Sequence, residues 1–232
     1  MEQFDIIIEK IRDNSIYILA FNKKKIIFTD INDNRYDIII PYNLYDNLLQ
    51  QLSKELEFNY SLTELMLVYP ENITNKGYKY LNNILKKNYS LNELYLLYEN
   101  ITNEEIKIFS DALKVNSSIT TLKLLSYGIE ELEELSDALK INSSITTLSL
   151  ISNEIKGLEE LSDALKVNSS ISFLNLPYNK ITDEGYKYLS DALKINSSIT
   201  SLDLLNNEIT YKGFEYLNES LKKNITLIEI NF

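Results

Sequence analysis

A block of twelve residues recurs almost unchanged four times along the chain. It begins at Phe109, Leu135, Leu161 and Leu189 and reads FSDALKVNSSIT, LSDALKINSSIT, LSDALKVNSSIS and LSDALKINSSIT. A repeat with a fixed period of about 20 to 50 residues is typical of a solenoid, in which each unit buries its apolar face only by stacking on its neighbours. The chain is therefore expected to fold as a stack of similar units.

Each unit carries the pattern L-x-x-L-x-L, with leucine or isoleucine at the apolar positions. The pattern starts at Leu62, Leu91, Ile119, Ile145, Ile171, Ile199 and Leu227, so successive units are 29, 28, 26, 26, 28 and 28 residues long. Alternating apolar positions favour a strand with one buried face. About 15 residues with apolar side chains at helical spacing follow each strand. Strands joined through helices in this way are expected to pair in parallel.

The segment from Ile171 to Asn196 closely matches LxxLxLxxNxIxxxGxxxLxxALxxN, and on this pattern residues 59–232 resemble the leucine-rich repeat family, in its ribonuclease-inhibitor-like class. The resemblance implies an α/β fold: a right-handed horseshoe solenoid with a parallel sheet on its concave face and helices on its convex face. It also implies a structural ladder, in which asparagine side chains after the strands bond backbone groups of the curved turns. Three residues occupy that position: Asn153, Asn179 and Asn207.

The first three units lack this asparagine, and Glu99 and Tyr127 stand at its position in two of them. Because a lost buried hydrogen bond costs on the order of 1 to 3 kcal/mol, the N-terminal half is expected to be looser or differently curved. The third and fourth units are also two residues shorter than the units after them, which predicts a tighter start to their helices.

Residues 1–58 are expected to form an N-terminal cap, and residues 59–232 about six repeats and a final strand. Apolar runs at 26–31 and 36–40 flank Asn32-Asp33-Asn34 and predict a hairpin, with 36–40 joining the sheet edge. We further expect a short helix over 2–12, a strand over 16–21 and a helix over 43–57.

Composition excludes several function classes. The formal net charge of −11 and the pI near 4.6 argue against nucleic-acid binding, which needs a basic surface. The absence of histidine and cysteine removes the usual nucleophilic pairs and the usual zinc and iron ligands, and no glycine-rich phosphate loop is present. A carboxylate pair is the chemistry that remains. We expect no catalytic residue, no metal, no cofactor and no enzymatic activity.

The chain has no apolar run of 18 residues, and its acidic start, MEQFDIIIEKIRD, differs from a secretory signal. We therefore expect no Sec signal peptide, no membrane binding and a cytoplasmic location. Repeat modules without Sec signals are familiar in effectors that bacteria deliver into host cells, so an effector in the host cytosol is one hypothesis by analogy. The Asn-x-Ser triplets at Asn116, Asn142, Asn168 and Asn196 are interpreted as one copied repeat position, in preference to glycosylation sites.

Strand positions between the buried leucines are expected to face the concave side. The first column holds Glu64, Glu93, Thr121, Thr147, Phe173, Ser201 and Ile228, and the second Met66, Tyr95, Lys123, Ser149, Asn175, Asp203 and Glu229. The third, Val68, Leu97, Leu125, Ile151, Pro177 and Leu205, continues into Tyr69, Tyr98 and Tyr178. Aromatic side chains are enriched at interface hot spots. The predicted partner-binding residues are Tyr95, Tyr98, Lys123, Phe173, Asn175, Tyr178, Asp203 and Glu229.

Other interpretations remain open from the sequence. The third column can be partly buried by the turn beside it. The acidic residues Glu130, Glu131, Glu133, Glu134 and Asp137, and likewise Glu154, Glu159, Glu160 and Asp163, suit a basic partner or a cation, but complementing helix N-termini is favoured. The aromatic residues Tyr78, Tyr80, Tyr186, Tyr188, Phe214 and Tyr216 favour packing between helices.

The function expected from these observations is recognition of a protein partner by a monomer. A structural scaffold that self-associates through Leu227–Phe232 is the alternative, because the last strand leaves an exposed edge. Carbohydrate binding by the acidic and aromatic residues of the concave face is the less favoured one.

Overall fold

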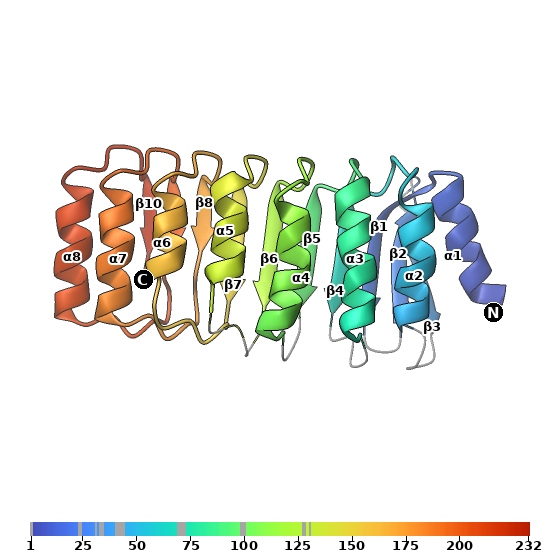
Figure 1. The fold of residues 1–232 in the computed structure, drawn as a ribbon, viewed down its shortest axis with the longest axis horizontal. Coiled ribbons are helices and arrows are strands. Elements are labelled where there is room, and N and C mark those ends of the chain that lie inside the picture. The colour runs from blue at the N-terminus through green and yellow to red at the C-terminus, as the bar shows by residue number, and fades with distance from the viewer. Residues whose placement is uncertain are drawn as a thin grey trace.

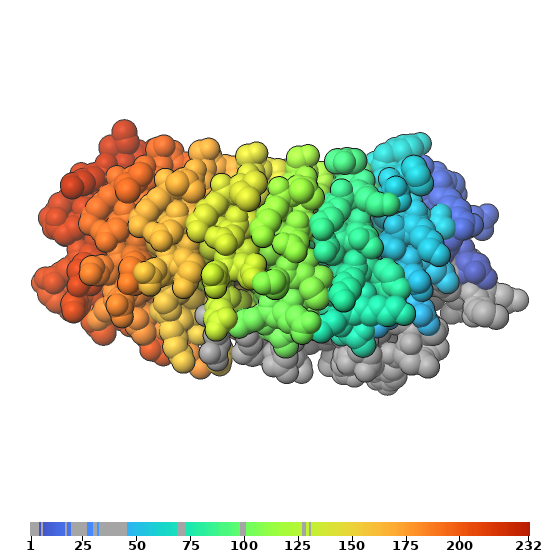
Figure 2. Space-filling view, in the orientation of Figure 1, coloured from blue at the N-terminus to red at the C-terminus, as the bar shows by residue number. Residues whose placement is uncertain are grey.

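The computed structural model of the chain describes residues 2–22, 25–30, 32, 35–39, 45–68, 73–97, 101–126, 129 and 131–232. These residues form a ten-stranded sheet with the strand order β10-β9-β8-β7-β6-β5-β4-β1-β2-β3. The helices stand side by side along one face of that sheet (Figure 1). On this side the repeats follow one another as parallel bands from the N-terminus to the C-terminus (Figure 2).

The repeat region alternates strands and helices. Its elements are β4 (Glu64–Val68), α3 (Asn75–Lys87), β5 (Glu93–Leu97), α4 (Asn103–Leu113), β6 (Thr121–Leu125), α5 (Glu133–Ile141), β7 (Thr147–Ile151), α6 (Glu159–Leu165), β8 (Phe173–Asn175), α7 (Asp183–Leu193), β9 (Ser201–Asp203), α8 (Tyr211–Leu221) and β10 (Glu229–Asn231). Neighbouring strands from β4 to β10 all pair in parallel. The predicted α/β solenoid with a parallel sheet is confirmed.

The two layers have different natural spacings. Packed helices lie about 8–10 Å apart, whereas neighbouring strands lie about 4.8 Å apart. Because the helices cover one side of the sheet, this difference in spacing favours a bend that places the uncovered side of the sheet on the inside. We call the side of β4–β10 that faces away from α3–α8 the open face.

The core runs along the whole stack between sheet and helices. In the third repeat Leu122 and Leu124 of β6 meet Phe109 and Leu113 of the preceding helix, and all four are fully buried. Burying one such side chain stabilises the fold by about 1.5–3 kcal/mol. Equivalent residues are buried in the neighbouring repeats, so each repeat depends on contact with the next.

The N-terminal elements extend the same sheet. They are α1 (Glu2–Arg12), β1 (Ile16–Asn22), β2 (Lys25–Asp30), β3 (Arg35–Ile39) and α2 (Tyr45–Glu55). β1 pairs in parallel with β4 and antiparallel with β2, and β2 pairs antiparallel with β3. The strand formed by part of 36–40 therefore lies at the outer edge of the sheet, whereas β1 borders the repeats. Arg12 joins α1 to α2 through a two-pronged ion pair with Glu55, at 2.8 and 2.6 Å.

Helix starts differ between long and short repeats. Thr102 caps α4 and forms a capping box with Glu105. In the two 26-residue repeats the N-cap position is held by Leu132 or Leu158, neither of which makes a side-chain capping bond, and α5 and α6 have only 9 and 7 residues. The two short units therefore lack residues at the start of their helices. Gly77, Gly185 and Gly213 lie in the first turns of α3, α7 and α8.

A row of asparagines links each repeat to the one before it. Asn168 donates its side-chain amide to the backbone carbonyls of Leu139 (2.8 Å) and Asn142 (3.1 Å), and its Oδ1 accepts the amide protons of Ser170 and Ile171. Residues at the same turn make the same kinds of bond: Asn59, Asn88, Asn116, Asn142, Asn196 and Asn224. We call these seven residues the rim asparagines. Because Asn116, Asn142, Asn168 and Asn196 are buried, the folded chain does not present them for glycosylation.

Candidate functional site: the open face of the sheet

The parallel register places equivalent side chains of neighbouring strands in line across the open face. The first column contains Glu64, Glu93, Thr121, Thr147, Phe173, Ser201 and Glu229, and the second contains Met66, Tyr95, Lys123, Ser149, Asn175, Asp203 and Asn231. The expected placement of Glu229 beside Asp203 and of Ile228 in the first column is wrong. Leu227 and Ile230 pack against the core, so Glu229 between them takes the position level with Ser201.

The apolar third column is interrupted. Val68, Leu97, Leu125 and Ile151 are half-buried on four neighbouring strands, but Pro177 is buried. The adjoining turn therefore buries the third column at Pro177. Two of the residues expected to extend this column, Tyr69 and Tyr98, lie outside the described residues, so Tyr98 has no place in the geometry that follows.

Tyr95 lies at the centre of a charged group on β4, β5 and β6. Its hydroxyl donates a hydrogen bond to Glu93, and the ammonium of Lys123 lies 4.9 Å from the centre of its ring. Burial raises the pKa of Tyr95, and the hydrogen bond to Glu93 raises it further. Burial, followed by the neighbouring charge of Glu93, raises the pKa of Glu64. This end of the open face thus holds two carboxylates, one ammonium and one phenol that stays protonated.

Phe173 is the exposed aromatic residue of the first column. It is 47% exposed, and its neighbours in register are the small polar residues Thr147 and Ser201. A phenyl ring between two short side chains stands above them. Because three strand spacings separate β5 from β8, about 14 Å lie between Phe173 and the column positions of the Tyr95 group.

Tyr178 occupies the turn after β8 in a left-handed backbone conformation. Its φ is 56° and its side chain is 55% exposed, while its amide donates to the carbonyl of Leu205 at 2.8 Å. The same position in the neighbouring repeats holds Ser152 and Asn206, with φ of 56° and 55°. A bulky residue is uncommon in this region, so the turn geometry alone does not call for tyrosine.

Two further acidic residues of the open face lie on β9 and β10. Asp203 Oδ1 accepts the amide proton of Leu205 at 2.9 Å and a hydrogen bond from Asn231 at 3.3 Å, and Glu229 accepts one from Ser201 at 3.3 Å. Asn175, in line with Asp203, is half-buried on β8. The face thus runs from the Tyr95 group through Phe173 and Tyr178 to these carboxylates.

The asparagines after the strands bond across successive turns. Asn179 donates to the carbonyls of Leu150 (2.8 Å) and Leu176 (3.0 Å), and its Oδ1 accepts the amide proton of Asn153 at 2.9 Å. Asn153 donates to the carbonyl of Leu124, and Asn207 to that of Leu176. These bonds hold the turn that carries Tyr178.

The family model described as Leucine Rich repeat matches residues 167–190 and 196–217. These two segments carry the strand, turn and helix pattern that the structure shows throughout the stack. The chain has the leucine-rich repeat fold.

Two solved structures similar to this chain have TM-scores below 0.5. Leiomodin-1 actin-binding site 2 is 23% identical, with 53% of this chain and 75% of that chain covered and a TM-score of 0.49. Internalin C2 from Listeria monocytogenes str. 4b F2365 is 18% identical, with 76% and 64% covered and a TM-score of 0.47. No protein with a curated function matches the sequence.

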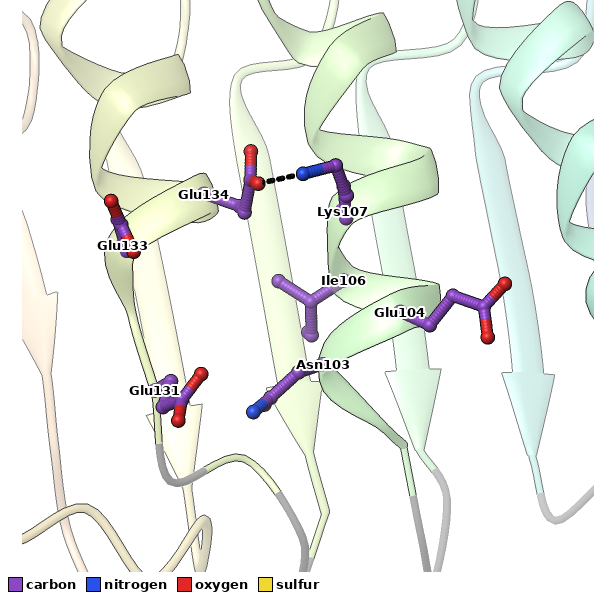
Figure 3. A pocket seen from close by; sticks show the side chains of 7 residues that line it. All are labelled: Asn103, Glu104, Ile106, Lys107, Glu131, Glu133 and Glu134. Carbon is purple, nitrogen blue, oxygen red and sulfur yellow. Dashed lines mark hydrogen bonds and ion pairs between the residues drawn. The ribbon is translucent and has the colours of Figure 1, made fainter.

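Several of the acidic residues on the helical side of the repeats form local ion pairs. A hollow of about 270 Å³ between α4 and α5 is lined by Asn103, Glu104, Ile106, Lys107, Glu131, Glu133 and Glu134 (Figure 3). Lys107 spans it to form an ion pair with Glu134. Asp137 and Asp163 pair with Lys140 and Lys166. Within the described parts of the chain, no three acidic residues are arranged to hold a metal ion, and Glu130 lies outside those parts.

The aromatic residues at the helix starts separate into two groups. Tyr78 and Tyr186 are buried between repeats, in keeping with the packing interpretation, whereas Phe214 at the same position of α8 is partly exposed. Tyr80, Tyr188 and Tyr216 are half-buried.

The structural roles of the rim asparagines and of Ser126 were not predicted from the sequence. The Asn-x-Ser triplets of the rim asparagines were interpreted only as one copied repeat position. Ser126 stands one residue before Tyr127, and its hydroxyl accepts the amide proton of Ile101 at 2.8 Å. Asn179 and Asn207 accept the equivalent amide protons of Ile155 and Ile181. A serine therefore supplies the acceptor in a repeat that lacks the asparagine.

Among the described residues, no helix is long and apolar enough to cross a membrane.

Proposed function

We propose that this chain binds a protein partner through the open face of its sheet. The observation that carries the proposal is the exposure of Phe173 between Thr147 and Ser201 in a regular parallel sheet. Burying such a ring in a partner removes a large apolar area from water at a small entropic cost, which is why aromatic residues dominate interface energies. The fold does not require the ring there, since the same column holds threonine and serine.

The surrounding groups give the face an orientation. Lys123 lies on the N-terminal side of Phe173 together with the carboxylates of Glu64 and Glu93. On the C-terminal side, the two columns hold the carboxylates of Asp203 and Glu229 and no cation. A partner with complementary charges at the two ends would be held in one direction, because charge complementarity fixes register more than it adds affinity. Tyr95, Asn175 and Tyr178 complete the proposed contact, and Tyr98 remains a predicted member outside the described residues.

Affinity capture tests this proposal. The wild-type chain and F173S/Y178S are immobilised, and proteins retained from eukaryotic cytosolic lysate are identified by mass spectrometry. We expect a protein that the wild type retains and the variant loses. V167S/I195S is the matched control, because it removes two exposed apolar side chains elsewhere and should retain the partner. Capture that survives F173S/Y178S would contradict the placement of the site.

We propose host-cell delivery as the setting in which this recognition acts, by analogy with repeat modules of delivered effectors. A reporter enzyme fused to the chain and expressed in the source organism tests it, since an effector carries the reporter into infected cells. A reporter that stays in the producing cell would contradict this setting.

Self-association is a second candidate function. It is favoured by Ile225, Ile228 and Phe232, which expose apolar surface around β10. Light scattering across a range of protein concentrations distinguishes the two. A mass that grows with concentration would support a scaffold, and a constant monomer mass would contradict it.

A further inference from the structure

The turns that lead from each helix into the next strand form one edge of the solenoid, the upper edge in Figure 1. We call this edge the upper rim; it comprises residues 58–61, 86–90, 114–118, 140–144, 166–170, 194–198 and 222–226. The rim asparagines fix the backbone of these turns from inside. The residues just before and after each asparagine project outward.

Aliphatic side chains are exposed at one repeated rim position. Val115, Ile141, Val167 and Ile195 each precede a rim asparagine and are 62–65% exposed. At the same position of other repeats stand Lys87 and Lys223, so the turn accepts a charged residue and does not need an apolar one.

The N-terminal part of the rim adds aromatic rings. Phe58 is 80% exposed, and Tyr60 and Tyr89 are more than 70% exposed. With Ile225, which is 96% exposed in the last turn, the row of exposed apolar side chains extends over all seven turns.

The upper rim is basic although the chain is acidic. Its turns contain eight lysines: Lys86, Lys87, Lys114, Lys140, Lys166, Lys194, Lys222 and Lys223. The first turn instead has an acidic residue at the lysine position, Glu57, which pairs with Lys87 at 2.7 Å. Carboxylates one helical turn away pair with several of them, as Asp163 does with Lys166 at 2.7 Å. Exposed pairs of this kind are weak, so these lysines can turn toward another anion.

Glu64, Glu93 and Glu229 begin β4, β5 and β10 beside this rim, but the carboxylates at the helix starts are remote from it. Glu104, Glu133, Glu159 and Glu184 lie at the opposite ends of the helices, in their first turns. The 11-residue helices α4 and α7 are about 16 Å long, and α5 and α6, with 9 and 7 residues, are about 14 and 11 Å long. All four lengths exceed the screening length of about 8 Å at physiological ionic strength. A negatively charged surface at the upper rim would therefore meet the lysines and be screened from the acidic ends.

The shape of the rim indicates what it fits. Because the strands pair in register, their starting points lie at one level. A bend of the sheet around an axis parallel to the strands leaves that level unchanged. Aliphatic and aromatic side chains projecting from a level edge, with lysines beside them, match a lipid interface: apolar groups enter the acyl boundary and lysines reach the phosphates. We propose that the upper rim binds the surface of an anionic lipid bilayer.

This proposal is independent of the protein partner on the open face. The expectation of no membrane binding rests on the absence of a spanning segment, which does not bear on attachment at the surface. A protein that recognises both a bilayer and a partner would hold that partner beside the membrane.

Cosedimentation with vesicles tests the proposal. Phosphatidylcholine vesicles with and without phosphatidylserine are mixed with the full chain. The wild type should sediment with the anionic vesicles only and be released by salt. V115S/I141S/V167S/I195S should bind at least about tenfold more weakly, with unchanged circular dichroism. F173S/Y178S, altered on the open face, should sediment like the wild type. A wild type that stays in the supernatant, or a rim variant that sediments equally, would overturn the proposal.

Fluorescence gives a second readout. The chain has no tryptophan, so V167W introduces a single indole at the rim and Y178W a single one in the turn after β8. Anionic vesicles should shift the V167W emission to the blue and leave Y178W unchanged. Equal shifts in both variants, or none in V167W, would contradict rim binding.

Discussion

The carboxylate of Asp183 in α7 accepts the backbone amide proton of Gly213 in α8 at 3.0 Å. The same carboxylate accepts the amide proton of Thr210 at 3.0 Å and its hydroxyl proton at 2.6 Å. One helix thus provides an anion for the N-terminus of the next, where three donors converge on it. Asp46 makes the same two bonds to Thr74 at the start of α3.

The contact explains the glycine. A Cβ at Gly213 would lie 2.7 Å from Asp183 Oδ1 and 2.8 Å from Ile209 Cγ1. Replacing glycine by alanine inside a helix normally gains up to about 1 kcal/mol, but here G213A should lower the free energy of unfolding because the carboxylate must move. Urea denaturation measures the change. G157A is the control, since its Cβ meets nothing within 4 Å; a stability gain in G213A equal to that in G157A would refute the contact.

Acid should weaken the same contact. The hydrogen bond from the Thr210 hydroxyl, followed by that from its amide, lowers the pKa of Asp183. The unfolded chain therefore binds a proton at Asp183 more readily than the folded chain. The stabilisation is present above the ordinary pKa of aspartate, about 3.9, and is lost as the pH falls through the lower folded pKa. The stability difference between wild type and D183N should therefore shrink as the pH falls from about 6 to about 3, a range that spans the ordinary pKa of aspartate. A difference independent of pH would refute this.

Two buried serines should respond to alanine in opposite directions. Ser126 accepts the amide proton of Ile101, so S126A leaves a buried donor unpaired and should cost about 1–3 kcal/mol. The hydroxyl of Ser162 is buried without a hydrogen-bond partner among the described residues, so S162A should gain up to about 1 kcal/mol. Denaturation of both variants under one set of conditions measures the contrast. Changes of the same sign would argue against the role of Ser126.

The folded chain should be less stable with Tyr178 than with asparagine at the same position. Relieving a bulky residue with φ of 56° gains roughly 0.5–1 kcal/mol, and Asn206 shows that the turn accepts asparagine. Y178N is therefore expected to raise the urea midpoint while weakening partner capture. The two readouts separate the cost to the fold from the use of the ring. A lowered midpoint would mean that the ring stabilises the fold.

The apolar pattern predicted the strands and their parallel order because inward leucines are the strongest constraint on register. The column placements of Ile228 and Glu229 were wrong, because their alignment by position ignored that Leu227 and Ile230 must face the core. The bond from Asp183 to Gly213 could not be predicted, because it depends on the distance between two helices in neighbouring repeats.

At the N-terminus, the hairpin and helices followed from local signals. The position of β1 next to the repeats could not be predicted from local signals, because strand order depends on contacts between residues remote in sequence. Phe173 and Tyr178 were singled out as exposed aromatics from their columns. Ser126 was missed because its turn differs by one position from the asparagine turns.

The rim asparagines recognise only main-chain carbonyls of the preceding repeat, and every residue type supplies those. Excising residues 117–142, from one asparagine to the next, would leave Asn116 followed by Ser143, with the local sequence KVNSSIT intact at the junction. The shortened chain would meet its neighbours through the same acceptors. A gene carrying near-identical copies of this block can therefore change its number of repeats in a single recombination event, altering the width of its recognition surface one strand at a time while leaving every joint unchanged.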